Sequence, residues 1–258
     1  MEAVENANAL NVNALNANAL NANALALNAI NASALDVNAL NPTELSALKH
    51  PGEAGYLSRQ LMKYVVSCAL GPAQSFSFSW TDILGDVHAE IYPGQLGLAT
   101  SWSQAPLDLQ GQQWISACLA SRVNWYGVSV TLSSRGSHPA LDKESLDETL
   151  TYATEEGAFW GNLFTSPPSV FACSDTLGIA HARAKQRDCA AGHIDQGGNI
   201  QECGILHIVG SCAAYCQPLD LFGAYHPRCV SNLDGSLLFG PFLNNPTATT
   251  SAITVFLD

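Results

Sequence analysis

Eight cysteines are the residues of this chain that could do the widest range of chemistry. They are Cys68, Cys118, Cys173, Cys189, Cys203, Cys212, Cys216 and Cys229. Six of the eight lie within residues 173–229, where glycine and proline break the sequence into short runs. An even number of cysteines in a weakly charged, irregular region is typical of a disulfide framework in an oxidising compartment. The sequence therefore predicts four structural disulfides in a secreted, periplasmic or cell-surface protein.

The pairing of these cysteines is open, because eight cysteines allow about 105 pairings. Two of them fall on predicted helices, Cys68 on the first and Cys118 on the second. We therefore expect a Cys68–Cys118 bridge that joins the two helices. A single bridge typically contributes about 2–4 kcal/mol by restricting the unfolded chain.

Metal ligation is one alternative for the last cysteines. Cys212-x3-Cys216, followed by His226-x2-Cys229, supplies four sulfur and nitrogen ligands. Zinc takes such ligands in tetrahedral geometry, usually from closely spaced pairs. Neither pair has the CxxC spacing, and an oxidising compartment competes for the thiols. A zinc-stabilised binding domain is therefore an alternative, and the disulfide interpretation needs no cofactor.

A nucleophilic cysteine is a second alternative. Gln112 lies six residues before Cys118, near the start of a predicted helix. This spacing resembles papain-like proteases, in which a glutamine amide and a helix-start amide stabilise the oxyanion. The resemblance implies Cys118 as the nucleophile of a secreted thiol-dependent hydrolase. His207, in an apolar strand-like run, would then act as the base.

Helical and strand periodicities indicate the elements that must position these residues. Apolar residues at helical spacing predict one helix over residues 57–68 and a second over residues 110–126. Aromatic residues alternate with serines over 75–80, and apolar residues alternate likewise over 87–91, which predicts a hairpin. A further strand is expected over 128–132.

Together these elements predict an α+β domain over residues 49–258, with two helices packed on an antiparallel sheet and disulfides joining its irregular part. Proline and glycine in residues 46–56 mark the boundary of this domain. Acidic residues concentrate in 141–156, a pattern typical of a solvated face or loop.

The first 48 residues hold a repeat of five residues. Leucine or isoleucine recurs at Leu10, Leu15, Leu20, Leu25, Ile30, Leu35, Leu40 and Leu45. A step of five residues turns about 140° around an α-helix, so these side chains would form no stripe on a helix. An odd period would also alternate faces along a flat strand. A square β-solenoid accommodates the period, and the repeats would make about two coils.

This repeat resembles the pentapeptide-repeat family, on the Leu-Asn-Val-Asn-Ala match at residues 10–14. The resemblance covers residues 6–48 and implies a short β-solenoid over residues 1–48. Solenoids gain stability by stacking, so a stub of two coils is expected to cap the following domain or to stack on another copy or another protein.

Two later segments carry a second resemblance. Residues 114–124 and 156–164 are similar to secreted or lipid-anchored proteins of myxobacteria that have no established activity. The resemblance would cover roughly residues 55–230. It implies a location outside the cytoplasm and no particular chemistry.

Charge and hydropathy exclude several partner classes. The chain has 22 acidic and 10 basic residues, so its net charge of −12 repels phosphate and no nucleic-acid partner is expected. No run of about 18 apolar residues predicts a transmembrane segment. Residues 1–6 lack the basic and apolar regions of a signal peptide, so predicted export implies a mature or trimmed chain. A complete chain kept in a reducing cytosol would favour zinc.

Tryptophans are the candidate ligand-binding residues. There are five: Trp80, Trp102, Trp114, Trp125 and Trp160. Trp102 and Trp160 lie in loop-like contexts, where exposed rings would offer a platform for carbohydrate or peptide. Ordinary packing in the core is the interpretation that we favour for all five, and the platform is the alternative.

The sequence favours a non-enzymatic protein. It contains no G-x-S-x-G, H-E-x-x-H, P-loop or G-x-G-x-x-G motif. We therefore expect an exported structural or interaction protein whose solenoid stub mediates stacking or self-assembly. The thiol hydrolase and the zinc-stabilised domain are the alternatives.

Overall fold

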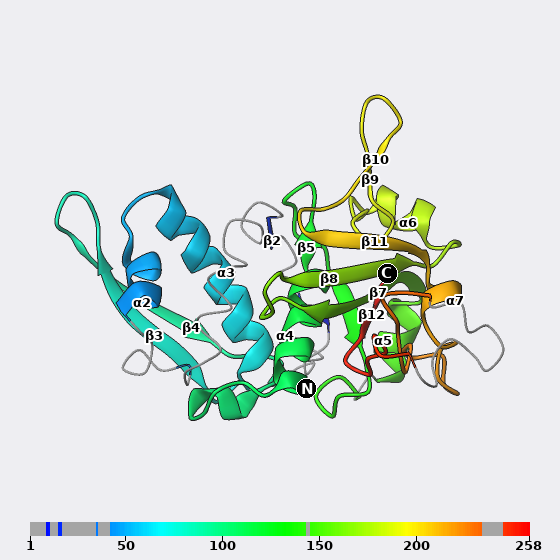
Figure 1. Ribbon diagram of the computed structural model, residues 1–258, viewed down its shortest axis with the longest axis horizontal. Coiled ribbons are helices and arrows are strands. Elements are labelled where there is room, and N and C mark those ends of the chain that lie inside the picture. Colours follow the sequence, from blue (N-terminus) through cyan, green and yellow to red (C-terminus); the bar gives the residue numbers. More distant parts are fainter. Residues whose placement is uncertain (1–8, 11–14, 17–34, 36–41, 143–144, 234–244) are drawn as a thin grey trace.

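The computed structural model describes residues 9–10, 15–16, 35, 42–142, 145–233 and 245–258 (Figure 1). The helices are α2 (Pro42–Lys49), α3 (Glu53–Ala69), the 3-10 helix η1 (Thr100–Ser103), α4 (Leu109–Ser121), α5 (Leu146–Thr151), α6 (Ile179–Ala184) and α7 (Cys212–Tyr215). The strands are β1 (Ala9–Leu10), β2 (Leu15–Asn16), β3 (Ser75–Thr81), β4 (Val87–Pro93), β5 (Val123–Asn124), β6 (Leu132–Arg135), β7 (Thr154–Asn162), β8 (Ser169–Ser174), β9 (His193–Ile194), β10 (Ile200–Gln201), β11 (Leu206–Ser211) and β12 (Ile253–Leu257). The protein is of the α+β class.

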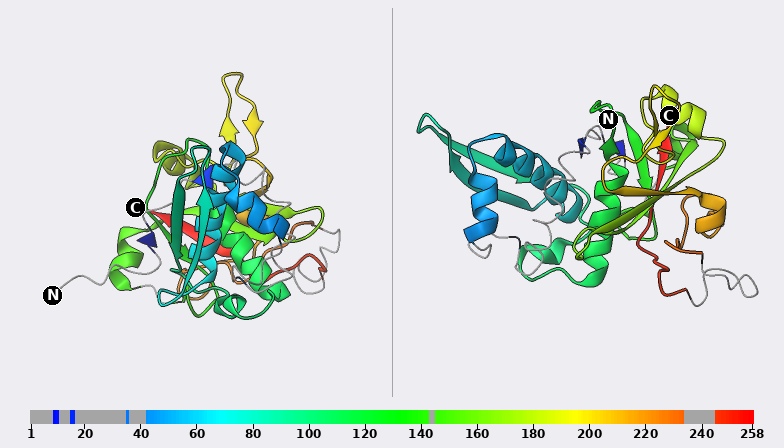
Figure 2. Two further views of the ribbon diagram at one scale, coloured as in Figure 1. Left: turned by 90° about the vertical axis from the view of Figure 1, so that its left-hand side faces the viewer. Right: turned by 45° about the horizontal axis from the view of Figure 1, so that its top comes forward.

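The main sheet has the strand order β1-β6-β12-β7-β8-β11. Its neighbours are antiparallel except for β8 and β11, which run parallel. The expectation of a purely antiparallel sheet is therefore wrong at this edge. Parallel neighbours need a crossover connection, and α6 with the projecting β9–β10 hairpin supplies it between β8 and β11 (Figures 1 and 2).

Both predicted helices and the predicted hairpin are present. Helix α4 contacts α3 as well as β7, β8 and β12, and it lies between the β3–β4 hairpin and the main sheet (Figure 1). In β3, Phe76 and Phe78 are buried, while the serines that alternate with them are exposed. Cross-strand partners share a face, and Phe76 pairs with Tyr92 and Ser77 with Ile91. The apolar residues at 87, 89 and 91 therefore face outward with the serines.

Helix α4 begins as its sequence dictates and ends earlier than expected. The Asp108 carboxylate caps it by accepting from the Gly111 amide at 2.7 Å. The helix ends at Ser121, and not at residue 126. Beyond it, the Asn124 side chain accepts from the Tyr126 amide at 2.8 Å and donates to the Val128 carbonyl at 2.9 Å. Such a local turn competes with helix continuation, and the next long strand begins only at Leu132.

The repeat region joins the following domain wherever the structure describes it. Strand β1 pairs with β6, and β2 pairs with β5. The last repeat was expected on a solenoid side, but Pro42–Lys49 is helical. Proline is favoured at the first helical position, because its ring fixes a helical φ and its missing N–H has no partner there. Most other repeat residues lie outside the described ones, so the β-solenoid and its stacking stay predictions.

All eight cysteines are paired, which confirms the predicted disulfide framework. The bridges are Cys68–Cys118, Cys173–Cys212, Cys189–Cys203 and Cys216–Cys229. The first is the pair expected from the two helices, and it joins the end of α3 to α4. None of the described helices combines the length and apolarity that a membrane crossing requires.

Removing the Cys68–Cys118 bridge should destabilise the protein more than removing Cys189–Cys203. The two bridges span 50 and 14 residues, so their loss should cost about 4 and about 3 kcal/mol of unfolding free energy through loop entropy. The measurement is guanidinium denaturation of the two double cysteine-to-alanine variants. A variant without Cys68–Cys118 that matched the wild type would show that this bridge restricts nothing.

Candidate functional site

The structure does not support the thiol-hydrolase hypothesis. The Cys118 sulfur is bonded to Cys68, so the thiolate that a nucleophile needs is absent. The Gln112 side chain donates to the Leu107 carbonyl at 3.3 Å and accepts from Asn162. His207 lies on β11 with half of its side chain exposed, and its Nδ1 is 3.3 Å from Glu202. No described contact joins His207 to Cys118.

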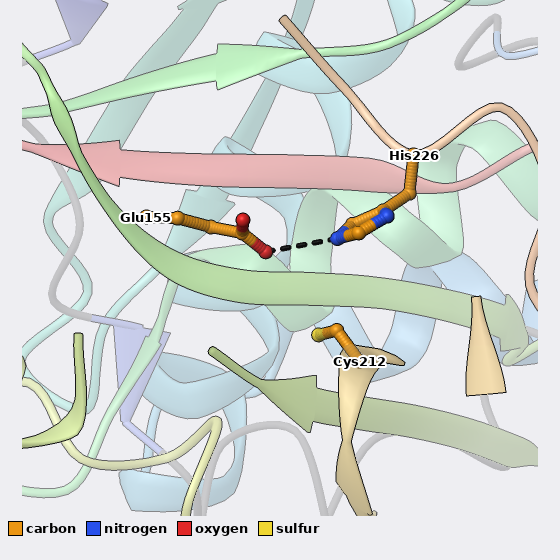
Figure 3. Close-up of side chains that lie close together, drawn as sticks. All are labelled: Glu155, Cys212 and His226. Atoms are coloured by element: carbon orange, nitrogen blue, oxygen red, sulfur yellow. Dashed lines mark hydrogen bonds and ion pairs between the residues drawn. The ribbon is translucent and has the colours of Figure 1, made fainter. Parts of the chain in front are cut away.

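The zinc hypothesis is also wrong for this oxidised protein. The sulfurs of Cys212, Cys216 and Cys229 are all used in disulfides, which removes three of the four ligands. The fourth residue, His226, points its Nε2 at the Glu155 carboxylate, 2.9 Å away (Figure 3). The sequence suggested a set of zinc ligands because cysteines in disulfides and cysteines that bind zinc occur at similar spacings.

Glu155 and His226 form a nearly buried pair beside the Cys212 sulfur (Figure 3). The Gln217 carbonyl accepts from the other ring nitrogen of His226. Burial opposes the charged ring, but the hydrogen bond to Glu155 and the charges of Glu155 and Asp175 together raise the pKa of His226. A cavity of about 200 Å³ opens beside this pair.

The acidic segment 141–156 is not simply a solvated face. Successive residues of a strand point to opposite faces, so Glu155 meets His226 while Glu156 meets Arg187 on the other side. The Arg187 and Glu156 side chains are fully buried, with Nη2 and Oε2 2.8 Å apart. Burial raises the pKa of Glu156, although Arg187 opposes the shift.

Trp102 and Trp160, the two tryptophans in loop-like sequence contexts, have no exposed surface, are packed in the core and form no exposed platform. Trp125 is 42% exposed instead, and its ring stacks on His193 with centroids 4.3 Å apart. The buried Asp188 carboxylate is 2.8 Å from His193 Nδ1 and also accepts from the Tyr126 hydroxyl. Trp125 and His193 thus form a partly exposed stacked aromatic pair next to β5.

The strongest candidate site is a cavity of about 310 Å³ between α3, β4 and the end of α4. We call it the Arg122 cavity. Its lining residues are Gln60, Lys63, Tyr64, Ser67, Ile91, Tyr92, Pro93, Gln95 and Arg122. The four from α3 have the spacing i, i+3, i+4 and i+7, so they form one face of that helix. The volume lies at the lower end of the range of small-molecule sites.

Arg122 is the C-cap residue of α4 and is only 1% exposed. Its Nη1 donates to the Ser67 hydroxyl at 2.8 Å, and Ser67 in turn donates to Gln95. Its Nε and Nη2 atoms have no hydrogen-bond partner in the described part of the chain. Burial lowers the pKa of Arg122 to about 10, so the guanidinium remains charged at neutral pH.

Tyr92 adds a buried hydroxyl to the same cavity. Burial and the neighbouring Glu90 carboxylate raise the pKa of Tyr92, so the phenol stays protonated and can donate. Lys63 lies at the mouth, with Nζ 5.3 Å from the Tyr92 ring centroid. No carboxylate belongs to the described lining, although the whole chain carries a charge of −12.

Sequence reasoning did not single out Arg122. One signal was present: a lone arginine at the end of a helix without any other charged residue, directly before β5. An arginine in such a position either is buried together with its helix or extends its aliphatic side chain so that the guanidinium reaches solvent. The sequence alone does not decide between these, because the turn that follows sets the direction of the side chain.

Replacing His226 tests the buried pair through its pH dependence. The pKa of His226 lies above the ordinary value of 6.5 only in the folded protein, so its stabilisation is complete below pH 6.5 and is lost as the pH rises through the raised value. We expect the melting temperature of the wild type to exceed that of His226→Gln most below pH 6.5 and progressively less above it. Calorimetry over a pH series measures this difference, and a difference independent of pH would contradict the assignment.

No family model, no curated protein and no solved structure matches this chain. The resemblances to pentapeptide-repeat and myxobacterial proteins therefore stay predictions, and function must be argued from the geometry of the Arg122 cavity.

Proposed function

We propose that this chain is an exported, non-enzymatic binding protein that holds a small organic carboxylate in the Arg122 cavity. The observation that carries the proposal is the buried guanidinium with two unpartnered nitrogens. Removing a charge from water costs several kcal/mol unless an opposite charge or hydrogen bonds compensate for it. An anionic ligand supplies that compensation, and because both nitrogens are buried from solvent, its entry requires the neighbouring side chains to move.

The free atoms of Arg122 favour a carboxylate over other anions. Nε and Nη2 form one edge of the planar guanidinium, and two parallel N–H donors match the two oxygens of a carboxylate. The third nitrogen, Nη1, is already held by Ser67, which fixes the plane of the group. The Tyr92 hydroxyl offers one further donor to the ligand.

The rest of the cavity indicates the body of the ligand. Tyr92 supplies an apolar wall from β4, opposite the polar face of α3, and its outward-facing neighbours Ile91 and Pro93 also border the cavity. A volume of about 310 Å³ holds about ten non-hydrogen atoms, if each takes roughly the 30 Å³ of a water molecule. A monocarboxylate with a short aromatic or branched apolar body fits both size and chemistry.

The disulfides support the exported location. Four bridges in one chain are typical of proteins that fold in an oxidising compartment, because reducing systems keep cytosolic thiols free. Two walls of the cavity lie next to one bridge, since Ser67 precedes Cys68 and Arg122 follows Cys118 on α4.

Ligand-induced stabilisation tests the proposal. We expect phenylacetate to raise the melting temperature, whereas phenylacetamide, which has the same shape without the charge, should not. A ligand at about 100 times its Kd stabilises the folded state by about 2.7 kcal/mol. The measurement is a thermal-shift titration at constant ionic strength. The carboxylate effect should disappear in Arg122→Met, and a shift that persists there would place the ligand elsewhere.

Stability of the ligand-free protein distinguishes a binding arginine from a structural one. Arg122→Met removes a buried charge that lacks an acidic partner, so the free energy of unfolding should stay unchanged or rise. Arg187→Met is the matched control. It leaves Glu156 buried and unpaired, which should cost about 3–5 kcal/mol. Equal losses in the two variants, measured by chemical denaturation, would show that Arg122 only supports the fold.

A further inference from the structure

Two disulfides touch one another in a second region of the molecule. Cys173–Cys212 joins β8 to α7, and Cys216–Cys229 joins the end of α7 to a later loop. The sulfurs of Cys173 and Cys216 are 3.6 Å apart. All four cysteines are buried in a small cluster with Trp160 and Ala158. The outer sulfurs, Cys212 and Cys229, belong to different bridges.

This cluster is open to a small thiol from one side. Cys212 and Cys216 line the cavity of about 200 Å³ next to Glu155 and His226. Each bridge therefore presents one cysteine to the cavity. Cys212 and Cys216 are 2% and 1% exposed, so this cavity is the side from which a small thiolate approaches them, whereas Cys173 and Cys229 do not line it.

We propose that the two disulfides form a thiol–disulfide exchange pair. Reduction of either bridge by a small dithiol leads to one product, which holds a new Cys173–Cys216 bridge and free thiols at Cys212 and Cys229. The contact between Cys173 and Cys216 makes this product common to both entry routes.

The first route begins at Cys212. A reductant thiolate attacks the Cys212 sulfur, forms a mixed disulfide and expels Cys173 as a thiolate. The Cys173 thiolate then attacks the Cys216 sulfur beside it, and Cys229 leaves with the electron pair and takes a proton. The second thiol of the reductant resolves the mixed disulfide and frees Cys212. One dithiol is oxidised to a disulfide, and the protein gains two electrons and two protons.

The second route begins at Cys216. Attack there expels Cys229, and the second thiol of the reductant then releases Cys216 as a thiolate. Cys216 attacks Cys173, and Cys212 leaves. The balance is the same, because one dithiol is again oxidised and one protein bridge is lost.

The surroundings of Cys212 favour products in which its thiol is free. Nitrogen of His226, oxygen of Glu155 and the Cys212 sulfur lie within 4.8 Å of one another. A protonated imidazole stabilises a neighbouring thiolate, which favours Cys212 as the leaving group in the last step of the second route and as a free thiol in the product. After exchange, β8 remains tied to α7 through Cys216, while residues 217–228 lose their covalent closure. The two disulfides thus form a redox-sensitive covalent link that closes this loop.

Partial reduction and mapping test the proposal. The native protein is titrated with dithiothreitol until two thiols appear among the four cysteines, then quenched with acid, alkylated and digested without reduction. We expect the alkyl label on Cys212 and Cys229, together with a peptide pair cross-linked through Cys173 and Cys216. Labels confined to Cys173 with Cys212, or to Cys216 with Cys229, would overturn it.

A variant tests whether Cys173 and Cys216 can form a bridge even if reduction unfolds the wild-type protein. The double variant Cys212→Ser with Cys229→Ser retains only the two inner cysteines of the cluster. Oxidative expression should give a Cys173–Cys216 bridge, seen by mass spectrometry as a chain that takes up no alkyl group before reduction. Two free thiols in this variant, with the other two bridges formed, would show that the inner sulfurs do not join.

Discussion

Burial of helix α4 is the constraint on which the rest of the structure depends. Residues from Trp114 to Ser121 are all buried, so the helix has no solvent face over its second half. A helix that is apolar all round must be covered on every side. The sheet strand β7 covers one side of it, and α3 covers another. The order of the fold follows, with the hairpin and α3 on one flank and the mixed sheet on the other.

The same burial explains how charge is distributed in this weakly charged protein. Arg59, Arg122, Arg135 and Arg187 are all buried. Arg59 donates to the carbonyls of Leu48 and His50, Arg135 to that of Tyr152, and Arg187 to Glu156. Each therefore replaces its lost hydration with fixed acceptors. Arg122 differs, because Ser67 is its one hydrogen-bond partner among those that the described residues provide.

Periodicity predicted the parts of the fold that local packing decides. The helix over 57–68, the hairpin and the Cys68–Cys118 bridge follow from apolar spacing, and all three are present. The parallel pairing of β11 was not predictable, because it depends on the direction in which a crossover returns. The partners of Glu155 and Glu156 were missed for a similar reason. A run of acidic residues is interpreted as solvent-exposed unless the sequence shows that it lies on a strand whose two faces are both buried.

The Arg122 cavity was not predicted from the sequence, although the elements that form its walls were. The bridge between Cys68 and Cys118 was predicted from two helices, and that bridge fixes the distance between the turns that carry Ser67 and Arg122. A hydrogen bond of 2.8 Å between residues 55 apart in sequence depends on this fastening. Without the bridge, the two helices would be free to separate and the guanidinium could regain water. Oxidation of Cys68 and Cys118 therefore holds the charge of Arg122 away from solvent, and the proposed binding site depends on that oxidation.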